Sequence, residues 1–182
     1  MENDINLSYP HKYATEVLPE MPPGNKYAHY YYPGGLLEGG HDGLLLKIFP
    51  EKKDSWVATF AKGRGGLSGV FSMPNPEKLC VVSSGAGYIV SASEPLSWEK
   101  VEAFKIVDVR MIPQHNLIAF VDADRTEIVS YNAQGIAWHT KQIGLDGLRI
   151  TQVTENEIRG KYWDIRSDSD MEFSINLQTG EL

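Results

Sequence analysis

The amino-acid sequence predicts an all-β fold built from short antiparallel strands. Runs of β-branched and aromatic residues alternate with clusters of glycine, proline, asparagine and aspartate, the pattern of strands bounded by turns. No segment keeps the apolar spacing of an amphipathic helix over several turns. With 182 residues, 42% apolar and 23% charged, the chain suits one large β domain with a buried core. A two-sheet sandwich or a barrel is the alternative.

Residues 1–43 differ from the rest because they are rich in proline, glycine and tyrosine and show neither strand nor helix periodicity. We expect an irregular arm packed against the β body. Tyr27, Tyr30, Tyr31 and Tyr32 form an aromatic cluster that is costly to leave in water. Packing is the simpler role for this cluster, and Tyr30, Tyr31 and Tyr32 are candidate binding residues if the arm contacts a ligand.

From residue 44 onward the sequence reads as one strand after another, so residues 44–182 are expected to form a single β domain. Because the connections are short, neighbouring strands should pair as hairpins. The expected strands are 44–49, 56–61, 69–73, 79–83, 88–92, 98–104, 106–112, 117–121, 127–131, 136–142, 148–153, 157–163 and 172–176.

The strands repeat with a period near 40 residues. Met73-Pro74 recurs 39 residues later as Ile112-Pro113, and Trp98 matches Trp138 at an offset of 40. A fainter copy aligns 127–135 with 172–180, which gives repeats near 67–105, 106–146 and 147–182. Four strands in about 40 residues are the length of one propeller blade. The prediction is therefore three to four propeller-like repeats in a small or partial β-propeller.

The segment from Ser91 to Trp98 resembles a degenerate Asp-box, the Ser-x-Asp-x-Gly-x-x-Trp hairpin of sialidase-like β-propellers. Ser91 and Trp98 keep the spacing, while Ser93 replaces the Asp and Pro95 replaces the Gly. In a second copy, residues 131–138, only the Gly and the Trp are kept. The resemblance implies β-propeller-type repeats rather than an activity. Sialidase activity is not implied, because no Arg-Ile-Pro motif is present.

The charge balance argues against a nucleic-acid partner. A net charge of -7 and a pI near 5.2 oppose binding to phosphates. The densest positive charge, Lys52 and Lys53, is interpreted as a solvated turn. No stretch reaches the length of a membrane span, and no export signal is visible. Cys80 is the only cysteine, so no intrachain disulfide forms, and we expect a cytoplasmic protein with a buried thiol.

The densest candidate for chemistry is the glycine-rich segment 34–43. His41 beside Asp42 is the candidate catalytic pair, since histidine next to a carboxylate can act as a general base. A solvated glycine-rich turn explains the same residues without chemistry. Arg64 lies in a Lys-Gly-Arg-Gly-Gly segment that could form an anion-binding nest, and it is a candidate binding residue.

No metal site and no cofactor are expected. The histidines have no ligand spacing, and the Asp-x-Asp pairs at 122–124 and 168–170 lack the glycine and glutamate of a calcium loop.

The repeated scaffold and the lack of a catalytic motif together favour a noncatalytic module that binds another protein, of an inhibitor or immunity type. The alternative is an enzyme or small-molecule binder that uses residues 27–42. Assembly of the protein with itself stays open.

Overall fold

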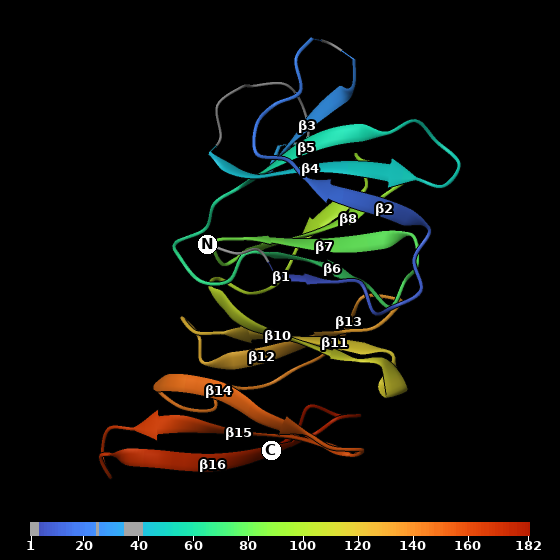
Figure 1. Cartoon of the computed structure of the whole chain (residues 1–182). Coiled ribbons are helices and arrows are strands. Elements are labelled where there is room, and N and C mark those ends of the chain that lie inside the picture. The colour runs from blue at the N-terminus through green and yellow to red at the C-terminus, as the bar shows by residue number, and fades with distance from the viewer. Residues whose placement is uncertain (1–3, 25, 35–41) are drawn as a thin grey trace. The chain divides into compact units, whose positions relative to one another are not determined.

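The computed structural model describes residues 4–24, 26–34 and 42–182, and these form two compact units (Figure 1). The first unit ends at Val101 and the second begins at Glu102. The described residues form sixteen β-strands and one 3-10 turn, η1 (Pro113–His115), without an α-helix. The all-β prediction is confirmed. The single domain expected from residue 44 is replaced by two units, because each unit closes its own hydrophobic core.

The first unit contains two sheets. Sheet I has the order β2-β4-β5-β3, with β2 (Tyr13–Val17), β4 (Gly43–Pro50), β5 (Trp56–Ala61) and β3 (Ala28–Tyr32). Sheet II has the order β1-β6-β7-β8-β9, with β1 (Asp4–Asn6), β6 (Gly69–Ser72), β7 (Lys78–Ser83), β8 (Ala86–Ser91) and β9 (Trp98–Lys100). Strands β6 to β9 form the four-stranded antiparallel meander of a propeller blade.

The expectation of an irregular arm over residues 1–43 is wrong, because three strands lie within it. β2 pairs antiparallel with β4, whereas β3 pairs parallel with β5 and β1 pairs parallel with β6. The register joins Asp4 to Gly69 and Ala28 to Trp56. Strands of three to five residues that pair with distant segments carry no hairpin turn and little alternation, so sequence patterns do not reveal them.

Alternating side chains of both sheets meet in the core of the first unit. Sheet I contributes Leu46, Ile48, Trp56, Ala58 and Phe60, and sheet II contributes Val70, Leu79, Val81, Tyr88 and Val90. Each of these side chains is buried, so the two sheets pack face to face.

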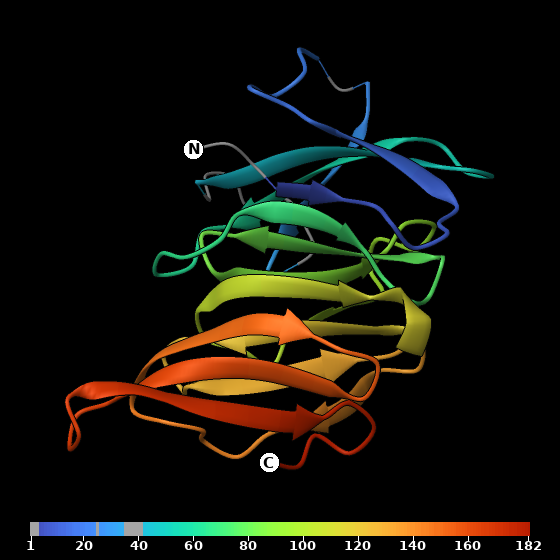
Figure 2. The ribbon, with the colours of Figure 1, turned by 60° about the horizontal axis from the view of Figure 1, so that its bottom comes forward.

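The second unit repeats this plan with two further sheets, seen in yellow to red in Figure 2. Sheet III is a meander of β10 (Ile106–Ile112), β11 (Leu117–Asp122), β12 (Glu127–Tyr131) and β13 (Ile136–His139). Sheet IV has three strands, β14 (Asp146–Val153), β15 (Glu157–Asp164) and β16 (Ser169–Asn176). The shared core includes Val121 and Ile128 from sheet III and Ile150, Ile158 and Ile175 from sheet IV.

Strand pairing corrects the repeat register expected from the sequence. β7 and β8 pair Val82 with Gly87, and β11 and β12 pair Asp122 with Glu127, so both strands repeat at an offset of 40 residues. The 39-residue offset expected for these strands is therefore one residue too short.

The predicted equivalence of Trp98 and Trp138 at an offset of 40 is confirmed, because Trp98 pairs with Val90 and Trp138 pairs with Ser130. Trp98 is half-buried and packs on Tyr32 of sheet I, across from its own sheet II. Trp138 is 7% exposed and packs toward sheet IV. The two indoles thus occupy equivalent positions, each packed toward the sheet opposite its own, and they differ in how deeply they are buried.

Candidate functional site

A pocket of about 810 Å³ opens in the first unit where three turns converge. The segment leading into β3 contributes Lys26, Tyr27 and Tyr30, and the β4–β5 turn contributes Lys52 and Lys53. Asp54, Trp56, Ser93 and Pro95 complete the set of residues that we call the lysine–tyrosine pocket. Ser93 and Pro95 belong to the turn between β8 and β9, the segment that resembles an Asp-box.

The aromatic wall of this pocket is held in place by the fold. The rings of Tyr30 and Trp56 meet edge to face, with centroids 5.4 Å apart. The Trp56 indole Nε1 donates a hydrogen bond of 2.8 Å to the main-chain oxygen of Ala92. Ser91 Oγ accepts from the Glu94 N–H at 3.2 Å and so caps the same hairpin turn. These contacts position Trp56 and the hairpin turn beside it.

The pocket carries excess positive charge on a protein of net charge -7. Three lysines, Lys26, Lys52 and Lys53, line it with one carboxylate, Asp54. All four side chains are exposed. An anionic group that enters the pocket would therefore meet ammonium groups beside aromatic rings.

Tyr27 interacts with two lysines, Lys26 and Lys47. Lys47 Nζ donates a 2.9 Å hydrogen bond to the Tyr27 hydroxyl oxygen and lies 4.1 Å from the centroid of the Tyr27 ring. Lys26 Nζ lies 5.5 Å from the same centroid. The hydrogen bond from Lys47, aided by the nearby positive charges, lowers the pKa of the Tyr27 phenol below its usual value.

The three consecutive tyrosines of β3 have different environments, because side chains alternate across a strand. Tyr30 lines the pocket. Tyr31 contacts His29, with ring centroids 4.2 Å apart, and Tyr32 is fully buried. The Tyr32 ring stacks on Phe60, and its hydroxyl donates to the Pro95 oxygen at 2.7 Å. Tyr32 is a core residue, so its assignment as a binding residue is wrong.

The other candidates from the sequence do not join this pocket. His41 lies outside the described residues. Asp42 forms an exposed ion pair of 2.5 Å with Lys62. Arg64 is exposed in the connection after β5, while the pocket adjoins Trp56 at the other end of that strand. Lys26, Lys52 and Lys53 were not predicted as site residues; the only signal in the sequence was the Lys52–Lys53 pair close before the aromatic Trp56.

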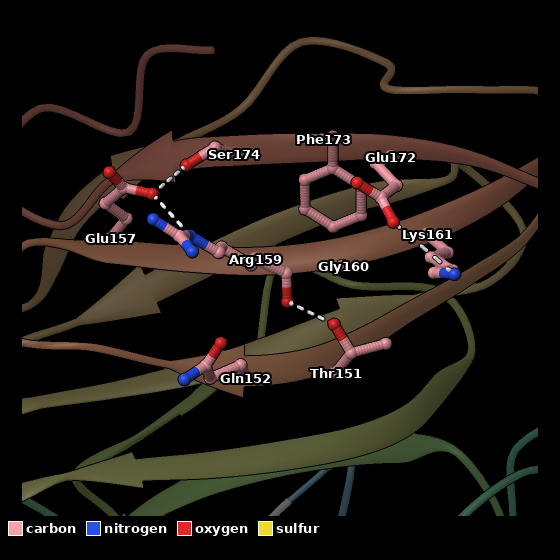
Figure 3. A pocket seen from close by; sticks show the side chains of 9 residues that line it. All are labelled: Thr151, Gln152, Glu157, Arg159, Gly160, Lys161, Glu172, Phe173 and Ser174. Carbon is pink, nitrogen blue, oxygen red and sulfur yellow. Dashed lines mark hydrogen bonds and ion pairs between the residues drawn. The ribbon is translucent and has the colours of Figure 1, made fainter.

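A second concave surface, the sheet IV trough, lies on the charged face of the second unit (Figure 3). It measures about 590 Å³. A β-bulge between Ile150 and Gln152 places Thr151 and Gln152 beside Arg159. Arg159 Nε donates to Glu157 Oε2 at 2.8 Å, and Lys161 Nζ lies 3.5 Å from Glu172 Oε1. The charges of the trough are therefore paired with one another, unlike those of the lysine–tyrosine pocket.

Ser174 adds to this network, because its hydroxyl donates to Glu157 Oε2 at 2.5 Å. The hydrogen bonds from Arg159 and Ser174 lower the pKa of Glu157.

Residues 4–24, 26–34 and 42–182 contain neither a metal-binding cluster nor a membrane-spanning helix. No cluster of three or more histidine, cysteine, aspartate or glutamate side chains that could hold a metal occurs there. None of the described segments forms a helix of the length and hydropathy needed to cross a membrane. Cys80 is buried, and burial raises the pKa of its thiol.

Comparisons with known proteins give a structural likeness alone. No family model and no curated protein matches the sequence. The structure is similar to the β-propeller domain of Cps50 (Swd1) from Myceliophteria thermophila, with 11% identity, a TM-score of 0.39, and coverage of 74% of this chain and 54% of that chain. It is also similar to AztD from Citrobacter koseri, with 11% identity, a TM-score of 0.42, and coverage of 97% and 62%.

The chain thus spans less than two thirds of either matched chain. At these TM-scores the likeness carries no argument about function.

Proposed function

We propose that this protein is a noncatalytic binding module whose lysine–tyrosine pocket receives an acidic segment of another protein. The observation that carries the proposal is the unbalanced charge of the pocket, where Lys26, Lys52 and Lys53 face one carboxylate beside a fixed aromatic wall. Aromatic residues held in a rigid setting are typical anchors of protein interfaces. Rim lysines add specificity and association rate toward a partner of opposite charge.

An inhibitor or immunity-type role agrees with this arrangement, because such proteins act by occupying a partner's surface. We further propose that the hairpin from Ser91 to Trp98 is a diverged Asp-box hairpin that has been recruited to the pocket wall through Ser93 and Pro95. The single buried thiol, Cys80, supports a cytoplasmic location.

A labelled acidic peptide, with glutamates around a central phenylalanine, tests the pocket. The wild-type protein should bind it with an affinity that weakens as salt increases, since exposed charges are screened. The double substitution Lys52→Glu and Lys53→Glu should weaken binding by about tenfold or more, equivalent to about 1.4 kcal/mol. Lys100→Glu, on the exposed strand β9 of the same unit, is the matched control and should leave binding unchanged.

Equal binding of a peptide with glutamine in place of glutamate would contradict the proposal. So would unchanged affinity in the double variant.

A small-molecule binder or enzyme is the second candidate, and one observation favours it. Tyr27 carries a lowered pKa beside Lys47, and a phenol of that kind can transfer protons. A thermal-shift screen against a metabolite library separates the two candidates. Stabilisation by one compound that disappears in Tyr27→Phe would favour this second candidate over the protein-binding module.

A further inference from the structure

A smaller cavity, which we call the recess, adjoins the lysine–tyrosine pocket in the first unit. It measures about 270 Å³, against about 810 Å³ for the pocket. Four residues line both cavities: Pro50, Lys52, Lys53 and Ser93. The other residues of the recess, all of them charged, are Lys12, Glu51, Glu77 and Glu94. The two cavities therefore meet along the β4–β5 turn, and a segment bound in the pocket has a continuous path into the recess.

Main-chain hydrogen bonds hold together the segments that surround the recess. The main-chain oxygen of Lys12, the residue before β2, accepts from the Glu51 N–H at 3.0 Å. The N–H of Lys12 in turn donates to the Pro76 oxygen, also at 3.0 Å. The N–H of Ala92, the residue after β8, donates to the Glu77 oxygen at 2.8 Å. The recess is therefore built from backbone that is tied to both sheets of the first unit.

Two carboxylates of the recess have no ion-pair partner in the part of the chain that the structure describes. Lys12 Nζ donates to Glu77 Oε1 at 2.7 Å, so these two charges are paired with each other. Glu51 and Glu94 are exposed, line the recess but not the pocket, and take part in none of the ion pairs. Apart from the lysines that it shares with the pocket, the recess therefore contributes unpaired negative charge.

The distribution of charge gives the groove formed by the two cavities a direction. The aromatic wall belongs to the pocket alone, Lys52 and Lys53 belong to both cavities, and Glu51 and Glu94 belong to the recess alone. An acidic segment in the pocket meets ammonium groups. Further acidic residues in the recess would meet like charges, which is unfavourable, whereas a basic residue there would meet two carboxylates.

We propose that the partner segment carries both signs of charge: acidic residues around an aromatic anchor in the lysine–tyrosine pocket, and at one end a basic residue in the recess beside Glu51 and Glu94. The assignment of the recess rests on the proposed function of the pocket, because it refines the partner chemistry of the same site. The recess discriminates against segments that are acidic throughout, which the pocket alone would accept.

Two fluorescein-labelled peptides, Glu-Glu-Phe-Glu-Glu-Gly-Lys and Lys-Gly-Glu-Glu-Phe-Glu-Glu, test the proposal by fluorescence polarisation. Each has a twin with glutamine in place of the lysine. General attraction to the positive pocket favours the twin, which carries more net negative charge. We nevertheless expect one lysine peptide to bind about threefold more tightly than its twin, an effect typical of an exposed ion pair. The other lysine peptide should show no gain, because the groove has one direction.

Removal of the two carboxylates provides the matched test on the protein. The double substitution Glu51→Gln and Glu94→Gln should abolish the preference for lysine. Its affinity for the glutamine twin should equal or exceed that of the wild type, because the pocket is intact. Glu20→Gln, at an exposed residue after β2 that lines neither cavity, is the control and should keep the preference of about threefold.

Different results would overturn the pocket and the recess. If none of the peptides binds at about 1 mM, the lysine–tyrosine pocket fails as a site, and the role of the recess fails with it. If the twins bind but neither lysine peptide gains affinity, the recess alone is overturned and the pocket stands. A preference for lysine that persists in the double variant would also overturn the recess alone.

Discussion

The indole Nε1 of Trp138 donates a hydrogen bond of 2.8 Å to the main-chain oxygen of Leu177. This bond joins sheet III to the residue that immediately follows β16 in sheet IV. The first unit contains the same device, in which Trp56 of sheet I donates to the oxygen of Ala92, the residue after β8. In both units an indole of one sheet thus donates a hydrogen bond to the residue that follows a strand of the sheet packed against it.

The two acceptors are fixed in the same way. The N–H of Leu177 donates to Asn156, the residue before β15, and the N–H of Ala92 donates to Glu77, the residue before β7. Each indole hydrogen bond is therefore accepted by a residue that is itself fixed to a hairpin.

The hydrogen bond from Trp138 predicts a loss of unfolding free energy when the indole nitrogen is removed. Trp138→Phe keeps an aromatic ring but leaves a buried carbonyl without its donor, and it should destabilise the protein by roughly 1–3 kcal/mol. Trp138→Ala should cost roughly 3–5 kcal/mol. Urea unfolding measures both changes. Trp163→Phe, at a residue 39% exposed, is the control and should stay within about 0.5 kcal/mol of wild type. Equal effects of Trp138→Phe and Trp163→Phe would contradict a stabilising role for the Trp138 hydrogen bond.

Tyr30 and Tyr32 should separate binding from stability. Tyr32→Phe removes the hydrogen bond to the Pro95 oxygen and should cost roughly 0.5–1.5 kcal/mol of unfolding free energy. Tyr30→Phe, at a half-buried pocket position, should leave stability nearly unchanged. Tyr30→Ala should weaken binding of the acidic peptide, since it removes an aromatic ring from the pocket wall. Denaturant unfolding measures the stability of the two Phe variants, and peptide titration on the same samples measures binding by Tyr30→Ala. A destabilised Tyr30→Phe variant would mean that this side chain belongs to the core.

The Tyr27 phenol should ionise at lower pH than an ordinary tyrosine, because Lys47 donates a hydrogen bond to it. Its pKa is lowered in the folded state, so the phenolate stabilises the fold only at alkaline pH, and this contribution is absent at neutral pH. An absorbance titration of the phenolate should show an early step in the wild type. Lys47→Met and Tyr27→Phe should each remove it, while persistence of the step in Tyr27→Phe would assign it to another tyrosine.

His29 should make the protein sensitive to mild acid. Burial lowers the pKa of its imidazole below the usual value of 6.5, so the unfolded chain binds a proton more readily than the folded one. Stability should therefore fall as the pH decreases through and below 6.5. His29→Gln, which can retain a hydrogen bond to Thr59 Oγ1, should flatten this part of the stability curve.

High salt serves as the control for His29, because desolvation rather than a neighbouring charge lowers the pKa of its imidazole. The slope should persist in salt. A slope that disappears in salt, or that His29→Gln leaves unchanged, would contradict the assignment.

Local hairpins could be predicted from this sequence, whereas long-range pairing could not. The segments that became β5, β7 and β11 are apolar runs between turn residues, and the structure places strands there. The strand expected over 98–104 ends instead at Lys100. The N–H groups of Phe104 and Lys105 donate to the Asp122 carboxylate, at 2.8 and 3.1 Å, in place of a strand partner. A side chain that replaces a ladder hydrogen bond leaves no periodic signal.

The candidate site depended even more on folding. Tyr30 was found from its aromatic neighbours, but nothing in a run of three tyrosines says which ring faces the core. Lys26, Lys52 and Ser93 come from three separate turns and meet only because β3 joins β5 in parallel and sheet II packs on sheet I.

The parallel pairing of β1 with β6 has a consequence for biosynthesis. Asp4 leaves the ribosome long before its partner Gly69, and loops of this length must close before the pair can form. The second unit needs only consecutive hairpins. Because local contacts form faster than distant ones, we expect the later-made half of the chain to mature more quickly than the earlier-made half. The nascent amino-terminal strands remain unpaired for longer, so we expect a chaperone to bind chiefly to them.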